Sequence, residues 1–177
     1  MNLEQDARQA KKGDQEAFIR LVKNLEVSLY RVARAILNND EDCADAIQET
    51  ILKAYHAIVK LKHESFVKTW MIRILINECR KVIAKQHGFV VSGEVPEPPG
   101  ASNEYERIEL KEAVDKLDDS LKIVITLHYF EDLSVKQVAA ALELPEGTVK
   151  SRLHRARHCL LELLDPDVKG DYAHGIH

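Results

Sequence analysis

Apolar side chains recur every three or four positions over most of the chain, and this period predicts amphipathic helices. The first helix is predicted over Ala17–Leu37, where polar Asn38 and its neighbours break the pattern. A second is predicted from about Asp42 to Leu61 and a third over Phe66–Lys85, so that the three form one block. The positions predicted to be buried in them are Phe18, Leu21, Val22, Leu25, Leu29, Val32 and Ile36, then Ile47, Ile51, Ala54, Tyr55 and Ile58, then Ile72, Leu75, Ile76, Cys79 and Ile83.

The segment from His87 to Asn103 has no helical period, and its prolines and glutamates predict an extended acidic linker. The helical pattern resumes near Glu104 and again over Ser120–Phe130, and the last residues from Asp165 predict a loose tail. The chain is therefore predicted to be all-α, with two small helical domains joined by a flexible acidic linker. The predicted boundaries are 1–87, linker 88–103, 104–165 and tail 166–177.

A helix-turn-helix is predicted in the second domain. Ser134 followed by Gln137 three positions later is a capping box, which indicates a helix beginning at Ser134. Pro145 cannot continue that helix but suits the first turn of another, so the break is expected near Glu143 and Leu144. The apolar stripe of the first helix consists of Val135, Val138, Ala139 and Leu142, and that of the second of Val149, Leu153, Ala156 and Leu160.

The opposite face of that second helix is rich in hydrogen-bond donors. It carries Thr148, Ser151, His154 and Arg155, with Lys150, Arg152 and Arg157 beside them. Such a face suits base edges and phosphates in a DNA major groove. The alternative is an ordinary surface helix whose charges are only solvated.

Charge is unevenly distributed, although the formal net charge is only −4. From Val67 to His87 five basic residues stand against one acidic residue, and from Gly88 to Ser120 nine acidic residues stand against three basic ones. No apolar run is long enough for a membrane span and no signal sequence is present, so a cytoplasmic location is expected. The three cysteines are far apart, and His154 and His158 lack a third ligand, so no disulfide, metal or other cofactor is predicted.

Two polar faces of the first domain differ in chemistry. In the third predicted helix Trp70, Arg73, Asn77 and Lys81 share one side, with Arg80 beside them, and this set suits a single DNA strand through stacking and phosphate contacts. In the second predicted helix Asp42, Asp45 and Glu49 line up next to Gln48, and they suit a basic protein surface. The alternatives are that Trp70 closes the core beside solvated cations, and that the acidic face is merely solvated.

Three stretches together resemble the extracytoplasmic-function (ECF) class of bacterial RNA polymerase sigma factors. Asp42–Thr50 resembles the polymerase-binding helix of that family, and Phe66–Arg80 its promoter-melting and minus-10 region. Leu133–Arg157 resembles its minus-35 reader. The resemblance implies a sigma factor that binds core RNA polymerase and directs it to promoters.

Several residue roles are implied by the resemblance. Asp42, Asp45, Gln48 and Glu49 would form the polymerase-binding set, with Asp45, Gln48 and Glu49 docking on the clamp helices of the large subunit. Lys68, Thr69, Trp70 and Arg73 would help to open the duplex and hold the non-template strand, and Asn77, Arg80 and Lys81 would read or position single-stranded minus-10 nucleotides. Thr148, Lys150, Ser151, Arg152, His154 and Arg155 would meet the duplex minus-35 element. The linker would run toward the RNA exit path. An anti-sigma factor, often membrane-bound, is the implied inhibitor.

The alternative function is a stand-alone helix-turn-helix regulator with an N-terminal dimerisation or sensing domain, which would bind an operator without polymerase. An enzyme is not predicted, because the chain has no phosphate-binding loop, nucleophile elbow or metal-ligand cluster. No small-molecule substrate is expected.

Overall fold

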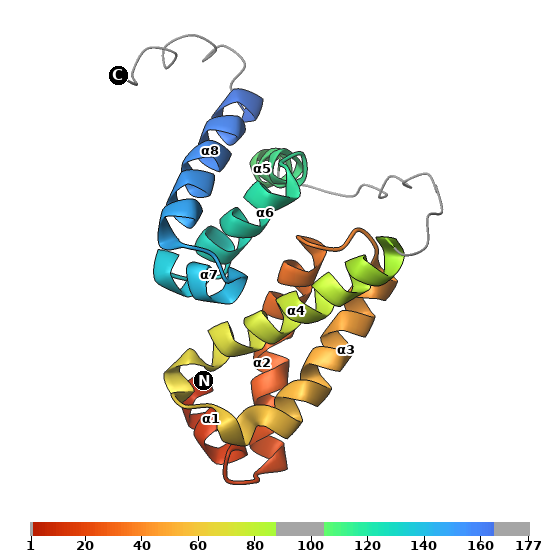
Figure 1. Cartoon of the computed structure of the whole chain (residues 1–177), viewed down its shortest axis with the longest axis vertical. Helices are drawn as coiled ribbons and strands as arrows, with labels where there is room; N and C mark the ends of the chain where they lie inside the picture. Colours follow the sequence, from red (N-terminus) through yellow and green to blue (C-terminus); the bar gives the residue numbers. More distant parts are fainter. Residues whose placement is uncertain (1, 88–104, 165–177) are drawn as a thin grey trace.

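The computed structural model describes residues 2–87 and 105–164, and within these ranges every regular element is helical (Figure 1). The N-terminal bundle, residues 2–87, contains α1 (Leu3–Ala10), α2 (Gln15–Arg34), α3 (Asp40–Ala57) and α4 (Val67–His87). Two short 3-10 turns, η1 (Ile58–Lys60) and η2 (Glu64–Phe66), connect α3 to α4. The predicted all-α class is therefore confirmed, and the predicted linker and tail lie outside the described residues.

Side-chain caps fix where the helices of this bundle begin. The Asp14 carboxylate accepts a hydrogen bond from the backbone N–H of Ala17 (3.1 Å), and the Asn39 side chain accepts one from the N–H of Asp42 (2.8 Å). Each satisfies a donor that has no partner inside its helix. The three predicted helices correspond to α2, α3 and α4, whereas α1 was not predicted because its eight residues carry only a short apolar pattern.

The buried face of α3 differs from the prediction. Its buried residues are Cys43, Ala46, Thr50 and Ala54, with Ile58 following in η1. Ile47 and Ile51 are half-buried and pack against the edge of the core, whereas Tyr55 is exposed, so the prediction was wrong for Tyr55. Small residues face the core because α3 packs closely against α2 and α4, which displaces the larger isoleucines to the edge of the contact.

The C-terminal bundle, residues 105–164, contains α5 (Tyr105–Asp115), α6 (Asp119–Ile125), the π-helical turn η3 (Thr126–Phe130), α7 (Val135–Leu142) and α8 (Glu146–Leu164). The predicted capping box is confirmed: the N–H of Gln137 donates to the Ser134 hydroxyl (3.2 Å), and the N–H of Ser134 donates to the Gln137 side chain (2.9 Å). Glu143 ends α7 in the left-handed conformation, with φ of 59°. The predicted break between the two helices is confirmed there.

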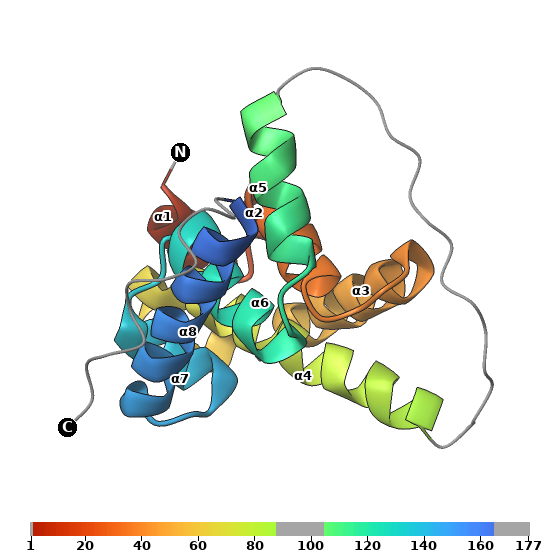
Figure 2. The ribbon, with the colours of Figure 1, turned by 90° about the horizontal axis from the view of Figure 1, so that it is seen from above.

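The two bundles pack against each other along α4. Helix α7 lies on α4, and η3 lies beside α2. Seen from above, the C-terminal bundle covers part of α2 and α4 and leaves α3 and the C-terminal end of α4 uncovered (Figure 2). Side chains that the sequence separates by the whole linker therefore meet.

Candidate functional site

The outer face of α8 is open to solvent. Lys150, Ser151, His154 and Arg155 are exposed, and Thr148 and Arg152 are half-buried. The opposite side is buried through Val149, Leu153 and Ala156, as the helical period predicted, while Leu160 is half-buried. The Ser151 hydroxyl donates to the carbonyl oxygen of Thr148 (2.9 Å), so its single proton is used within the helix and its lone pairs can accept a hydrogen bond. The exposed donors on this face are those of Lys150 and Arg155, with half-buried Arg152 beside them.

The predicted strand-binding face of α4 is divided into two sides. On one side a hollow between α3 and α4 is lined by Lys53, Ala57, Trp70, Ile74, Asn77, Glu78, Arg80 and Lys81. Trp70 is half-buried: its ring packs on the core, as one of the two alternatives expected, and it also borders the hollow. Its large apolar area is the physical reason, because a fully solvated indole is unfavourable.

Charges in this hollow are paired through Glu78. Its carboxylate accepts from the ammonium groups of Lys53 (2.5 Å) and Lys81 (3.0 Å). Burial is the largest influence on the pKa of Glu78 and raises it, but the hydrogen bonds from both lysines outweigh burial and lower the pKa. Lys53 was missed by sequence reasoning, because it lies on another helix and 25 positions from Glu78.

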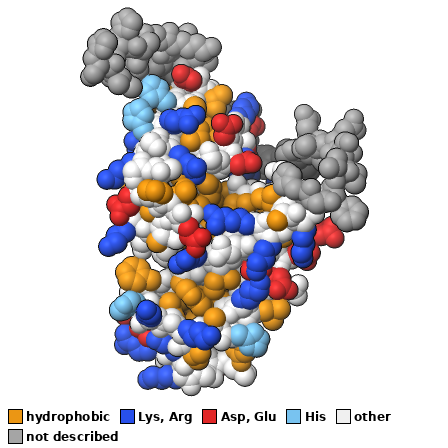
Figure 3. All heavy atoms as spheres, viewed as in Figure 1, with side chains coloured by type: hydrophobic (Ala, Val, Ile, Leu, Met, Phe, Trp, Pro, Cys, Tyr) orange, Lys and Arg blue, Asp and Glu red, His pale blue; other side chains and the backbone are white. Residues whose placement is uncertain are grey.

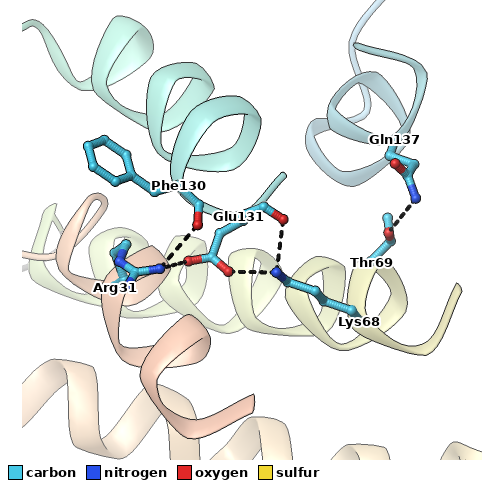
Figure 4. Close-up of polar contacts among 6 residues, drawn as sticks. All are labelled: Arg31, Lys68, Thr69, Phe130, Glu131 and Gln137. Atoms are coloured by element: carbon cyan, nitrogen blue, oxygen red, sulfur yellow. Dashed lines mark hydrogen bonds and ion pairs between the residues drawn. The ribbon is translucent and has the colours of Figure 1, made fainter. Parts of the chain in front are cut away.

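On its other side α4 contacts the C-terminal bundle. The Arg73 guanidinium pairs with Glu143 (2.6 Å), and that of Arg80 donates to the carbonyl oxygen of Leu142 (3.0 Å). Gln137 donates to the hydroxyl of Thr69 (3.4 Å; Figure 4). The α4 side chains that were predicted to share one face therefore lie partly in the hollow and partly in the contact with the C-terminal bundle.

Glu131 is the centre of that interface. Its side chain is completely buried, and its carboxylate pairs with Arg31 of α2 and with Lys68 of α4 (2.9 Å) (Figure 4). The Lys68 ammonium also donates to the backbone carbonyl oxygen of Glu131 (2.8 Å), and Arg31 donates to that of Phe130 (3.3 Å). We call these contacts, together with those of Thr69, Arg73 and Arg80, the inter-bundle interface.

Local backbone geometry positions Glu131. It follows the π-helical turn η3, and its N–H donates to the carbonyl oxygen of Thr126 (3.1 Å). Asp132 then adopts φ of 55°, a left-handed conformation that Asp tolerates, so the chain turns back directly after Glu131. Sequence reasoning missed Glu131 because nothing in its neighbourhood distinguishes it from a surface glutamate.

The electrostatics of Glu131 favour the ionised form. Burial is the largest influence and raises the pKa, but hydrogen bonds from Ser28, Lys68 and Arg31 and the charge of Lys68 outweigh it, so the pKa is lowered. The carboxylate therefore remains charged inside the interface at neutral pH.

The acidic face of α3 lies away from this interface. Asp45, Gln48 and Glu49 are exposed, whereas Asp42 is half-buried and accepts from the side chain of Gln86 in α4 (2.6 Å). Beside this face is an apolar hollow between α2 and α3, lined by Glu26, Val27, Tyr30, Asp40, Ala44, Ile47, Gln48 and Ile51. Sequence reasoning assigned the two isoleucines to the core and so missed the hollow.

The described residues contain no group of three His, Cys, Asp or Glu side chains that could hold a metal ion. The rings of His154 and His158 lie 5.5 Å apart on α8. Cys79 is buried in the core as predicted, and burial raises the pKa of its thiol to about 12. Among the described helices, none has both the length and the apolar character needed to cross a membrane.

Two family models match the chain: sigma-70 region 2 over residues 21–88, and sigma-70 region 4 over residues 107–160. The chain is 30% identical over 183 residues to the ECF RNA polymerase sigma factor SigW of Bacillus subtilis, covering 93% of this chain and 97% of SigW. The chain therefore belongs to the ECF sigma factors, the alternative sigma factors that direct RNA polymerase to promoters. Sigma factors are DNA-binding initiation factors rather than enzymes.

Solved structures agree with this assignment. CnrH in complex with the cytosolic domain of CnrY matches with a TM-score of 0.68 and 29% identity over 93% of this chain and 98% of that chain. The sigma factor RpoE in complex with the anti-sigma factor NepR from Bartonella quintana matches with a TM-score of 0.69 and 25% identity, over 85% and 98% of the two chains. The stand-alone regulator is not better supported, because the N-terminal bundle itself matches a sigma region.

Proposed function

We propose that the chain divides promoter recognition among three surfaces, each on a different helix. Residues 1–87 act as sigma region 2, residues 104–165 as region 4, residues 88–103 as a tether and residues 166–177 as a tail. The observation that carries this proposal is the separation of charge: exposed carboxylates on α3, and exposed cations on α4 and α8. On one face of the molecule, Lys and Arg side chains are spread over both bundles (Figure 3).

The polymerase would bind at α3. Asp45, Gln48 and Glu49 are exposed, and they adjoin the apolar hollow in which Val27 is 67% exposed and Tyr30 46% exposed. An apolar centre with a charged rim is the usual anatomy of a protein interface. The carboxylates would meet basic residues on the clamp helices of the large subunit, and the hollow would receive apolar side chains. Asp42 contributes from the edge of this surface.

Charge reversal tests this surface. Asp45→Lys and Glu49→Lys should each weaken binding of core RNA polymerase by about tenfold or more, because a rim carboxylate would become a repulsive ammonium. Glu16→Lys is the matched control, since it makes the same charge change at an exposed position of α2 outside the hollow. Pull-down with core polymerase measures the effect. Undiminished binding by both reversed variants, with unchanged thermal melting, would refute the proposal.

Promoter DNA would bind at α4 and α8. Lys68, Thr69, Trp70 and Arg73 would help to open the duplex, and Asn77, Arg80 and Lys81 would hold the single-stranded minus-10 element. Trp70 borders a hollow that also contains Lys53, so a base stacked on its ring would lie beside cations that can meet its phosphate. Thr148, Lys150, Ser151, Arg152, His154 and Arg155 on α8 would contact the duplex minus-35 element.

The polymerase makes these weak contacts act together. Two DNA-binding surfaces on one tether gain affinity only when their spacing matches the promoter, and a bound polymerase fixes that spacing. The chain would work in the cytoplasm, where core polymerase and promoters are. CnrH was solved in complex with the cytosolic domain of CnrY, and RpoE in complex with the anti-sigma factor NepR. We propose that an anti-sigma factor also binds this chain.

A further inference from the structure

Two histidines lie next to each other on α8. His154 and His158 are four positions apart, so successive turns place them on the same side of the helix, with Cβ atoms about 5–6 Å apart. Their ring centres are 5.5 Å apart, and the ring planes are inclined by 46°. His154 is exposed and His158 is half-buried, and Figure 3 shows His side chains grouped over this part of α8. The geometry points to a two-histidine site for a divalent transition-metal ion such as Zn²⁺ or Ni²⁺.

The distance between the two rings fits a shared ion. A zinc ion lies about 2.1 Å from a ligating histidine nitrogen, and therefore about 3.2 Å from the centre of that ring. Two rings bound to one tetrahedral ion consequently have their centres about 5 Å apart. The 5.5 Å between the rings of His154 and His158 is close to this value, so small rotations of both side chains would bring one nitrogen of each ring to the ion.

The ligands determine which ions this site would take. Imidazole is a good ligand for Zn²⁺, Ni²⁺ and Cu²⁺, whereas Mg²⁺ and Ca²⁺ prefer oxygen ligands. In residues 2–87 and 105–164, no three His, Cys, Asp or Glu side chains are grouped so that they could hold a metal ion, so water would fill the remaining coordination positions. Such a site exchanges its ion with solvent, unlike a structural zinc site with four protein ligands. The ion would therefore be a reversible ligand of the folded chain.

Neighbouring charges act on a bound cation in both directions. Arg155 and Arg157 lie beside the two rings and repel a cation, although salt weakens this repulsion at an exposed site. Glu162 lies four positions after His158 and is exposed, so its carboxylate attracts the ion from the same side of the helix. The ion uses one nitrogen of each ring, and the second nitrogen can keep a hydrogen bond, which commonly orients a ligating histidine.

The site shares one residue with the proposed minus-35 surface. His154 is exposed there together with Lys150 and Arg155. A bound ion would occupy the His154 ring and add two positive charges to this face of α8. Metal binding and promoter binding would then change each other's affinity by the same factor. The metal site itself depends only on the positions of the two rings, and it stands whether or not α8 binds DNA.

Isothermal titration calorimetry of the tag-free, full-length chain with Zn²⁺ and with Ni²⁺ tests the site. His154→Gln and His158→Gln should each lower the affinity about tenfold or more, because each removes one ligand from a chelating pair. His56→Gln is the matched control: it makes the same change at an exposed position of α3 and should bind both ions as wild type does. An excess of Mg²⁺ should not displace either ion. In NMR spectra of the imidazole nitrogens, Zn²⁺ should shift the signals of His154 and His158.

Two double variants test whether helical spacing forms the site. His158→Gln combined with Lys150→His again places two imidazoles four positions apart on α8, so it should restore most of the lost affinity. His174→Gln combined with His177→Gln removes the two histidines at the end of the sequence and should leave the affinity unchanged.

Three results would overturn this inference. They are the absence of Zn²⁺ and Ni²⁺ binding to wild type, unchanged affinity in both His154→Gln and His158→Gln, and loss of binding when only His174 and His177 are replaced. Because His154 is exposed, His154→Gln should fold normally, and circular dichroism checks this. His154→Gln therefore keeps the test valid even if the half-buried His158 cannot be replaced without unfolding.

Discussion

Arg73 of α4 and Glu143 at the end of α7 form an ion pair with 2.6 Å between Nη2 and Oε1, although 70 positions separate them in the chain. Glu143 has φ of 59° at the position where helices usually end in glycine. A glutamate at this position is locally strained, and its carboxylate reaches the other bundle. One residue thus couples the turn of the helix-turn-helix to the surface of α4.

Substitutions of Glu143 should distinguish the effect of the strained backbone from the effect of the ion pair with Arg73. Glu143→Gly and Glu143→Ala both remove the carboxylate, but only glycine relieves the left-handed backbone. We expect the glycine variant to be about 1 kcal/mol more stable than the alanine variant, which corresponds to about 2–4 °C in Tm. Calorimetry measures this difference. Equal stability of the two variants would contradict the predicted strain at this position.

Acidification should loosen the inter-bundle interface through Glu131. Its pKa in the folded chain is lowered from 4.5, so its contribution to stability is complete above 4.5 and is lost as the pH falls through the lowered pKa. The unfavourable effect of burial is largest, yet hydrogen bonds from Ser28, Lys68 and Arg31 outweigh it.

The measurement is the difference in Tm between wild type and Glu131→Gln, followed from about pH 7 to about pH 4 and below. Other carboxylates with lowered pKa values, such as Glu64 and Glu78, titrate in both proteins and cancel in this difference. The advantage of wild type should shrink only at the acidic end. A difference that stays constant over the whole range would show that the charge of Glu131 has no stabilising role.

Substitutions of two apolar residues of α2, Leu29 and Val27, should affect different properties: the first should lower stability and the second polymerase affinity. Leu29 is 1% exposed, and Leu29→Ala should lower the free energy of unfolding by about 2–5 kcal/mol through the cavity it leaves. Val27 is 67% exposed in the proposed polymerase surface, and Val27→Ala should leave stability unchanged. Its polymerase affinity should fall about fivefold, since about 1 kcal/mol of apolar contact is lost.

Denaturant melts and a polymerase-binding titration measure these two effects. Normal polymerase affinity of Val27→Ala would place the hollow between α2 and α3 outside the interface.

Two arginines of α8 provide a matched pair for the minus-35 surface. Arg155 is exposed on the donor-rich face, whereas the Arg157 guanidinium donates to the hydroxyl of Tyr129 in η3 (3.1 Å). Arg155→Ala should cost the holoenzyme about 1–3 kcal/mol in promoter binding and leave the fold unchanged. Arg157→Ala should mainly lower the Tm, because it removes a contact within the C-terminal bundle.

Gel shifts at several salt concentrations distinguish a base contact from a phosphate contact of Arg155. Loss of affinity on all sequences, with a shallower salt dependence, indicates a phosphate contact. Equal promoter binding by wild type and Arg155→Ala would remove Arg155 from the DNA surface.

The sequence alone determined most of the helices and the cap of α7, because these depend on neighbours within a few positions. The apolar periods gave α2, α4 and α8, and Ser134 with Gln137 gave the beginning of α7. The separation of acidic from basic surfaces was also readable, since exposed charges follow helical spacing. The short α1 was missed, because its apolar pattern is too brief to distinguish it from a loop.

Only the tertiary structure decided which faces meet. The orientation of α3 depended on how closely it approaches α2 and α4, so Ile47 and Ile51 lie at the edge of a hollow instead of in the core. The burial of Glu131 depended on a π-helical turn and on two cations 63 and 100 positions away. Hydrogen bonds within a helix or a turn depend on residues a few positions apart, so the local sequence predicts them. A contact between the bundles depends on how all the helices pack, and no short sequence pattern specifies that packing.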